Sequence, residues 1–269
     1  MPNFIKLLPL RSYRTKVNHK LTFFLLVMSL FTSWQSVQAS TAQNAPAELT
    51  NLLTQIDTAA SQGNTKAVMQ YYSPNFTHSD GLNRQSMEKA LVSLWQRYPR
   101  LRYTTQLQSW RRQGNTVIAE TVTQISGLPG ANSQNMALNA TIRSEQRING
   151  QQIIQQNIIS ERTQLTSGAK PPQIDFRLPQ QVKVGQQFSF DAIVSEPLGE
   201  DYLLGAALEE PVKPETLLKP TPVNLELLGS GGLFKIGQAP PTPGSRWVSA
   251  VIMRGEGTTM VTQRLQIVK

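Results

Sequence analysis

The sequence predicts an α+β domain, in which three helices lie on a curved and mainly antiparallel sheet, followed by an all-β sandwich. Apolar residues recur at helical spacing up to about residue 98 and then alternate with polar residues, which is the period of a half-buried strand. Prolines are sparse in residues 40–170, which hold four, and frequent in residues 171–269, which hold eleven. Between them TSGAKPP, at 166–172, combines small residues and prolines, which is typical of a domain boundary.

The first 39 residues have the layout of a secretory signal peptide. Five basic residues precede the apolar stretch LTFFLLVMSLF at 21–31, and the segment ends in SVQA. The apolar stretch is shorter than the roughly 20 residues that a membrane-spanning helix needs. We therefore expect cleavage after Ala39 and a periplasmic or secreted bacterial protein with no membrane span after leader removal. An uncleaved membrane anchor is the alternative.

The charge and the cysteine content exclude several classes of function. Of the formal charge of +9, five units come from the leader; residues 40–169 carry eleven basic and seven acidic groups, and residues 170–269 carry ten of each. A nucleic-acid partner is therefore not expected. The chain has no cysteine, so disulfides, thiolate catalysis and Cys-based zinc sites are excluded. No cofactor is predicted.

Residues 48–98 predict three helices. In ELTNLLTQIDTAASQG, at 48–63, apolar residues recur at helical spacing and Gly63 ends the run. Asn64 is a suitable N-cap for a second, short helix, TKAVMQYY, which ends before Pro74. The third helix begins after Asn83, and one apolar stripe follows it to its end: Met87, Leu91, Leu94, Trp95 and Tyr98.

Four long segments with a period of two follow these helices. They are LRYTTQLQSWRR, TVIAETVTQI, NMALNATIRSEQRI and QQIIQQNIISERTQL. Gly114 lies in the first turn between them, and Asn149-Gly150 is the strongest two-residue hairpin signal. The segments are therefore predicted to form an antiparallel meander that the helices cover on one face.

The order of these elements resembles the nuclear transport factor 2-like superfamily, and its SnoaL-like and ketosteroid-isomerase-like branches match best. The resemblance covers residues 46–166, and it is carried by Gly63-Asn64, Tyr71-Tyr72, SPNFTHSDG, the helix with Trp95, and RING at 147–150. It implies a cone-shaped domain with a deep apolar cavity. Such folds serve as enzymes, ligand carriers and protein-binding modules alike, so the resemblance does not imply one function.

After a linker at 167–172, residues 173–269 show short strand-like segments with turn signals between them. LPQQVKVGQQFSFDAIV and SRWVSAVIMRGEGTTMVTQRLQIV resemble the first and last strands of bacterial immunoglobulin-like sandwiches. The core of this domain is expected to rest on four residues: Phe188, Phe190, Trp247 and Val251. EEPVKPETLLKPTP, at 209–222, is predicted to be a connecting loop, because its prolines lack the donor that a central strand needs.

The candidate catalytic residues are His78 and Asp80. His78 is the only histidine outside the leader, and residues two apart on a strand face the same side. The resemblance to ketosteroid isomerases implies a base here: an ungapped count gives Asp80, and alignment on Gly81 favours His78. Either group is capable of abstracting a proton. Asp80-Gly81 is equally well explained as a turn.

The other catalytic groups of that family do not match. Ile56 and Ser144 fall where the resemblance implies hydrogen-bond donors to an oxyanion. A structural or cavity-lining role for His78 and Asp80 is therefore favoured over catalysis, and two such residues are too few ligands for a metal site. The candidate ligand-binding residues are aromatic, and each also fits a role in the core: Tyr72, Trp95, Tyr103 and Trp110.

Three functions are consistent with the sequence. The favoured one is an exported, non-catalytic protein of the cell envelope that binds a small apolar ligand or a protein partner through its first domain. The second is a SnoaL-like isomerase, cyclase or hydratase with His78 or Asp80 as general acid/base. The third is a structural adaptor that forms a homodimer, its cavity filled by Trp95, Tyr103 and Trp110.

Overall fold

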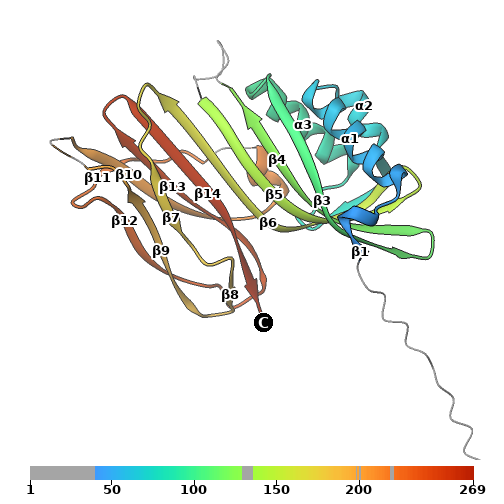
Figure 1. Cartoon of the computed structure of the whole chain (residues 1–269). Helices are drawn as coiled ribbons and strands as arrows, with labels where there is room; N and C mark the ends of the chain where they lie inside the picture. The colour runs from blue at the N-terminus through green and yellow to red at the C-terminus, as the bar shows by residue number, and fades with distance from the viewer. Residues whose placement is uncertain (1–39, 129–135, 198, 200, 219–220) are drawn as a thin grey trace, which may run out of the picture. The chain divides into compact units, whose positions relative to one another are not determined.

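The computed structural model describes residues 40–128, 136–197, 199, 201–218 and 221–269. The predicted leader, residues 1–39, lies outside the described residues. Within the described part, a large sheet and a small sheet carry most of the chain, and α1, α2 and α3 lie together at one end of the large sheet (Figure 1). No helix in this part has the length and hydropathy of a membrane span.

The predicted fold class is wrong. Among the described residues the protein is mostly β, with 56% in strands and 19% in helices, and it does not form a three-helix α+β cone. An 11-stranded sheet instead runs through both predicted domains. Nine of its strands follow the order β1-β3-β4-β5-β6-β14-β13-β10-β11, and β2 and β8 pair with β6 and β14 beside this order. The reason is the pairing of β6 with β14, which joins Arg162–Gly168 to Gly257–Gln263. The division into domains at residues 167–172 and the immunoglobulin-like character of the second part stay predictions.

The three predicted helices are present, and two of them begin at the predicted caps. They are α1 (Ala47–Ser61), α2 (Thr65–Gln70) and α3 (Arg84–Arg97). The Asn64 side chain accepts a hydrogen bond from Ala67 N, and Asn83 forms a capping box with Ser86. The second helix ends earlier than expected, because the chain continues from Tyr72 as a strand.

The strands of the large sheet follow the predicted period of two. Their bounds are β1 (Ser40–Thr41), β3 (Leu101–Gln113), β4 (Thr116–Gly127), β5 (Met136–Asn149), β6 (Gln152–Gly168), β10 (Leu203–Pro211), β11 (Glu226–Leu227), β13 (Gly244–Arg254) and β14 (Gly257–Val268). The antiparallel order β3-β4-β5-β6 is confirmed. Gly150 has a φ of 58° in the turn from β5 to β6, a conformation that glycine adopts readily. Two strands pair in parallel: β2 (Tyr72–His78) with β6, and β8 (Gln181–Lys183) with β14.

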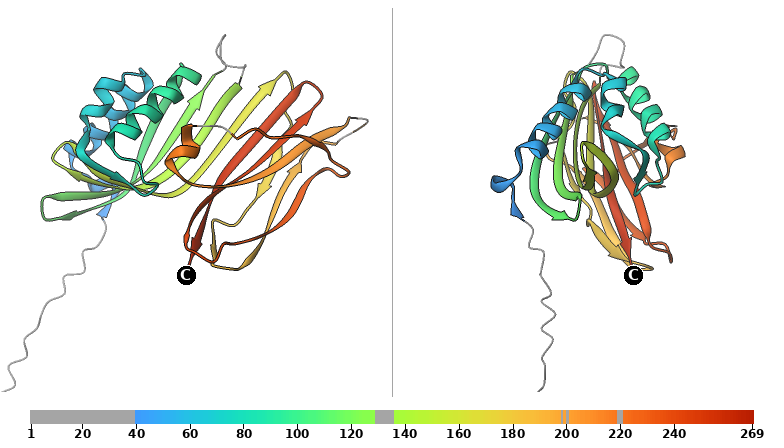
Figure 2. Two further views of the ribbon diagram at one scale, coloured as in Figure 1. Left: turned by 180° about the vertical axis from the view of Figure 1, so that it is seen from behind. Right: turned by 90° about the vertical axis from the view of Figure 1, so that its right-hand side faces the viewer.

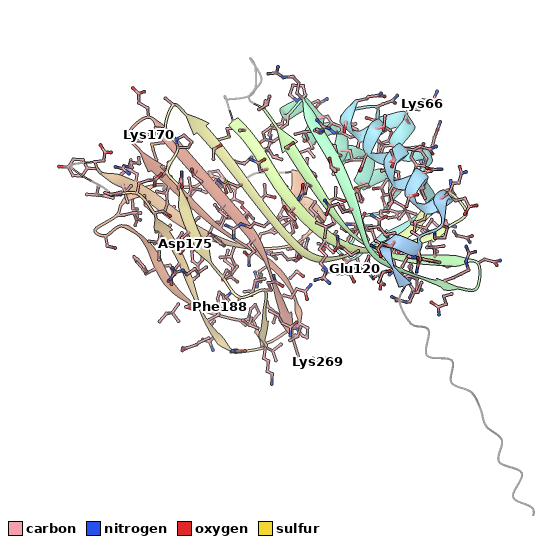
Figure 3. All side chains as sticks on the ribbon, viewed as in Figure 1. Lys66, Glu120, Lys170, Asp175, Phe188 and Lys269 are labelled. Atoms are coloured by element: carbon pink, nitrogen blue, oxygen red, sulfur yellow. The ribbon has the colours of Figure 1, made fainter. Side chains whose placement is uncertain are left out.

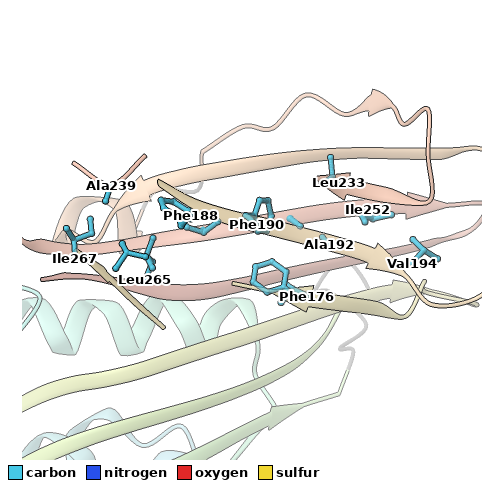
Figure 4. Packing of buried hydrophobic residues seen from close by; sticks show 14 of the residues in the cluster. Phe176, Phe188, Phe190, Ala192, Val194, Leu233, Ala239, Ile252, Leu265 and Ile267 are labelled. Atoms are coloured by element: carbon cyan, nitrogen blue, oxygen red, sulfur yellow. The ribbon is translucent and has the colours of Figure 1, made fainter. Parts of the chain in front are cut away.

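The C-terminal part adds the small sheet, with β7 (Ile174–Arg177), β9 (Gln187–Val194) and β12 (Gly232–Gln238) in the order β12-β9-β7. Phe176, Phe188 and Phe190 pack from this sheet against Ile252 and Leu265 of the large sheet (Figure 4). Charged side chains such as Lys66, Lys170 and Lys269 lie at the exterior (Figure 3). In the predicted loop, α4 (Pro214–Leu218) packs against α3.

Of the four residues expected in the core of the C-terminal part, two belong to its buried cluster. Phe188 and Phe190 belong to its buried cluster, which takes Val248, Ala250 and Ile252 from β13. Side chains alternate along a strand, so Trp247 and Val251 lie on the opposite face of β13. That face of the large sheet is the one on which the cavity described below lies.

Candidate functional site

α1–α3 cover one end of the large sheet (Figure 2). Residues of these helices and of the sheet line a cavity of about 350 Å³. Its walls are mostly apolar. The helices contribute Leu53, Ile56, Ala60, Val68, Met87, Ala90, Leu91 and Leu94, and the sheet contributes Ile125, Leu138, Ala140, Ile142, Ile153 and Ile158. A mostly apolar cavity with a few convergent polar groups is the usual form of a small-molecule site.

A bulge in β6 places its polar residues on the cavity side. The pairing of β5 with β6 shifts between Arg143 and Ser144, so that Ile159 is left without a partner. Gln156 and Ile158 line the cavity before the bulge, and Glu161 and Thr163 line it after the bulge. An extra residue reverses the alternation of faces, and without it Glu161 would point to the other side of the sheet.

A buried ionic cluster forms part of the cavity lining. Arg264, on β14, donates from Nη1 to Asp80 Oδ1 (2.9 Å) and from Nη2 to Asp80 Oδ2 (2.7 Å) and Glu161 Oε2 (2.9 Å). Trp247 Nε1 donates to the same Glu161 oxygen at 3.1 Å. The Arg264 side chain is 2% exposed, and that of Asp80 is 7% exposed. Burial lowers the pKa of Arg264, but hydrogen bonds and charges from Asp80 and Glu161 outweigh this and leave the pKa raised.

His78 lies beside this cluster and is uncharged at neutral pH. Burial lowers its pKa from 6.5, and the charges of Asp80, Arg264 and Glu161 act on it in opposing directions. Its Nδ1 accepts a hydrogen bond from Asp80 N at 3.1 Å. A neutral imidazole that accepts at Nδ1 carries its proton on Nε2. In this arrangement His78 is a donor at Nε2, and it is not poised to accept a proton there.

Two tyrosines on the cavity wall are also held neutral. Burial raises the pKa of Tyr72 and of Tyr103 to about 12. The Tyr103 hydroxyl accepts from Trp95 Nε1 at 3.1 Å, so its own proton is available to another acceptor. Tyr72 packs edge to face on Phe76, with ring centroids 4.8 Å apart.

A row of polar side chains crosses the sheet beneath the cavity. Thr121 and Ser144 lie within hydrogen-bond distance (3.3 Å), and Gln156 Nε2 donates to Ser144 Oγ at 3.4 Å. Gln146 Nε2 donates weakly to Thr121 Oγ1 at 3.5 Å, whereas its Oε1 is buried without a partner among the described residues. Gln146 is 7% exposed and belongs to the cavity lining, and a buried acceptor without a donor is energetically unfavourable.

The structure brings four of the six predicted site residues to the cavity: Tyr72, His78, Asp80 and Tyr103. Trp95 does not line the cavity but donates to Tyr103, which does. Trp110 packs with Leu107 and Val117 against a core cluster that includes Leu49 of α1. Sequence reasoning missed Glu161, Trp247 and Arg264. The available signal was a charged residue, Arg264, within a strand-like segment that also holds the apolar Val261 and Leu265. Within the described ranges, no group of three or more His, Asp or Glu could hold a metal ion.

The depressed pKa of His78 predicts a loss of stability in mild acid. Below 6.5 the unfolded chain binds a proton that the folded chain does not, so the free energy of unfolding falls as the pH is lowered; above 6.5 His78 contributes nothing. One such group contributes a slope of at most about 1.4 kcal/mol per pH unit. In His78→Asn the amide oxygen keeps an acceptor for Asp80 N, and the slope should be smaller. Denaturant unfolding of both proteins from about pH 7 to about pH 5 measures it. Identical slopes for the unchanged protein and His78→Asn would contradict a lowered pKa of His78.

Among the comparisons with known proteins, one family model matches the C-terminal part of the chain. Residues 169–268 match a family described as a domain of unknown function (DUF8623). No curated protein sequence matches the chain. Several solved structures are similar over less than half of the chain.

Among these structures are Bd1075 of Bdellovibrio bacteriovorus (13% identity, 41% of this chain and 38% of that one, TM-score 0.31) and TsrD of Streptomyces laurentii (13% identity, 42% and 87%, TM-score 0.32). Another is an NTF2-like protein of unknown function from Cytophaga hutchinsonii (12% identity, 43% and 91%, TM-score 0.25). The chain thus spans less than half of the length of Bd1075. At these TM-scores the likeness carries no argument about function.

Proposed function

We propose that the protein binds a small, largely apolar molecule in the cavity between α1–α3 and the large sheet. The observation that carries this proposal is the cavity itself: about 350 Å³ with mostly apolar walls, and with Tyr103, Gln146 and the Arg264 cluster as its polar groups. Burial of an apolar ligand there gains roughly 25 cal/mol for each Å² of apolar surface removed from water. The polar groups would fix the orientation of the ligand.

Filling the cavity from within tests the proposal. Ala140 lies on the cavity floor and is 9% exposed, so Ala140→Phe places an aromatic ring in the space that the ligand needs. We expect the affinity for Nile red, a neutral apolar dye, to fall at least about tenfold, and overpacking to cost about 1–3 kcal/mol of stability. Fluorescence titration measures the affinity.

Ala137→Phe is the matched control for this experiment. Ala137 lies three residues earlier on the same strand and is absent from the cavity lining. The control should bind the dye as the unchanged protein does. Equal affinities of all three proteins, or no dye binding by any, would contradict the proposed function. Native mass spectrometry of protein purified from its host then identifies the natural ligand by its mass.

An enzymatic function of the same cavity remains the alternative hypothesis, with His78 or Asp80 as acid/base. The hydrogen bonds of Asp80 and of His78 count against direct proton abstraction by either residue. Both carboxylate oxygens of Asp80 accept from Arg264, and Nδ1 of His78 accepts from a backbone amide. Each group would have to give up a hydrogen bond before it could take a proton at these atoms. Retention of full turnover by His78→Ala and Asp80→Ala, once a substrate is known, would end this hypothesis.

The adaptor hypothesis required a cavity filled by three aromatic side chains. Of these, only Tyr103 lines the cavity, and the space next to it is open. This arrangement favours ligand binding over a purely structural role. Export to the periplasm or the medium is part of the proposal and rests on the leader alone. It predicts a purified protein that begins at Ser40, and an intact mass that includes residues 1–39 would contradict it.

A further inference from the structure

We infer that the ligand carries a protonated amine on an apolar body, and that Glu161 holds this amine beside Arg264. The inference rests on the proposed function and names the chemical class of the ligand. The excess of negative charge among the groups that line the cavity carries it.

Three carboxylates and one guanidinium line the cavity. Asp80 and Glu161 share Arg264, and Asp57 is bound separately by the backbone nitrogen (2.6 Å) and the hydroxyl (2.7 Å) of Thr105. His78 is the remaining basic group in the lining, and burial keeps it uncharged at neutral pH. The lining therefore has a formal excess of two negative charges, in a space with mostly apolar walls. Uncompensated charge in such surroundings is unfavourable, and a cationic ligand reduces it.

The same count argues against an anionic ligand. Arg264 is the only cationic side chain in the lining, and two carboxylates already neutralise it. A carboxylate or phosphate on the ligand would add a third negative charge to one guanidinium. Like charges that close together in a poorly solvated site repel each other strongly.

Unused hydrogen-bond acceptors point to the same ligand. Oε2 of Glu161 accepts from Arg264 and Trp247, and its Oε1 has no protein donor within the described ranges. The side chain is 21% exposed, so Oε1 remains accessible. The side chain of Gln146, which belongs to the lining, holds a second acceptor without a donor among the described residues, its buried Oε1. An ammonium group is a donor with no acceptor, which matches Oε1 of Glu161.

Three ligands with the same alkyl chain test the inference: decylamine, decanol and decanoate, each titrated against Nile red bound to the protein. We expect decylamine to bind at least about tenfold more tightly than decanol, because hydrogen bonds to charged groups are stronger than neutral ones. Decanoate should bind most weakly. Glu161→Gln should bring the affinity for decylamine down to that for decanol. Glu145→Gln removes an equal charge from a residue outside the lining and should leave the preference unchanged.

The outcomes separate the two proposals. If the dye binds but decanol or decanoate displaces it as well as decylamine does, or if Glu161→Gln keeps the preference, the inference is overturned and the binding function stands. If neither the dye nor any of the three ligands binds, both proposals are overturned. The ligand series needs no variant, so the test remains decisive even if Glu161→Gln does not fold.

Discussion

Replacement of Arg264 by methionine is expected to cost about 3–5 kcal/mol of the free energy of unfolding, which is the usual loss when one partner of a buried ion pair is removed. The change deletes three hydrogen bonds and leaves the carboxylates of Asp80 and Glu161 without their counter-charge. Asp80 is 7% exposed, so water cannot fully replace the guanidinium. Denaturant unfolding followed by Trp fluorescence measures the loss.

Two further variants separate this explanation from a simple loss of packing. Arg177→Met removes an arginine from the exposed pair with Asp175 and should cost less than about 1 kcal/mol. Asp80→Asn and Glu161→Gln, added to Arg264→Met, remove the uncompensated charges and should restore a large part of the stability. A loss for Arg264→Met no larger than that of the Arg177 control would show that the cluster is not a buried electrostatic unit.

The elements of the N-terminal part could be predicted because their signals are local. Three of the helix ends are marked within a few residues, by Asn64 and Asn83 at the starts of α2 and α3 and by Gly63 after the end of α1. The alternation of side chains and the Asn149-Gly150 turn specify neighbouring antiparallel strands. Tyr72 and Tyr103 lie on the cavity wall because apolar and aromatic residues at these spacings face the covered side of the sheet.

The site residues that the sequence did not predict are brought into place by strand pairing, which no local pattern specifies. Arg264 reaches Asp80 only because β14 pairs with the second half of β6. In the sequence, β14 has the same alternation whether it ends a separate sandwich or continues a larger sheet. The position of Glu161 depends on a bulge at Ile159 that has no glycine to mark it. The C-terminal part was therefore expected to lie apart from the cavity, whereas it supplies Trp247 and Arg264 to the lining.

Substitution of Gly168 by alanine is expected to cost more than about 4 kcal/mol, a loss seen only where a substitution disrupts buried structure severely. Gly168 is the last residue of β6, where that strand meets Gly257 at the start of β14. Its φ is 87°, which is unfavourable for an L-residue with a side chain. An added Cβ would also overlap the carbonyl oxygen of Glu256, which is backbone and has no rotamer to adopt. The β6–β14 pairing would have to separate at this end.

Comparison of Gly168→Ala with Gly150→Ala separates the effect of the steric overlap from the effect of the positive φ. Gly150 has a φ of 58° in a hairpin turn, and an added Cβ there meets no atom within 4 Å. The variant should lose only the backbone strain, about 1–2 kcal/mol. Because β14 positions Arg264, Gly168→Ala should also weaken Nile red binding, and Gly150→Ala should not. Equal stability losses in the two variants would mean that β6 and β14 do not form one sheet across residues 162–168, and the C-terminal part would then have no place in the cavity.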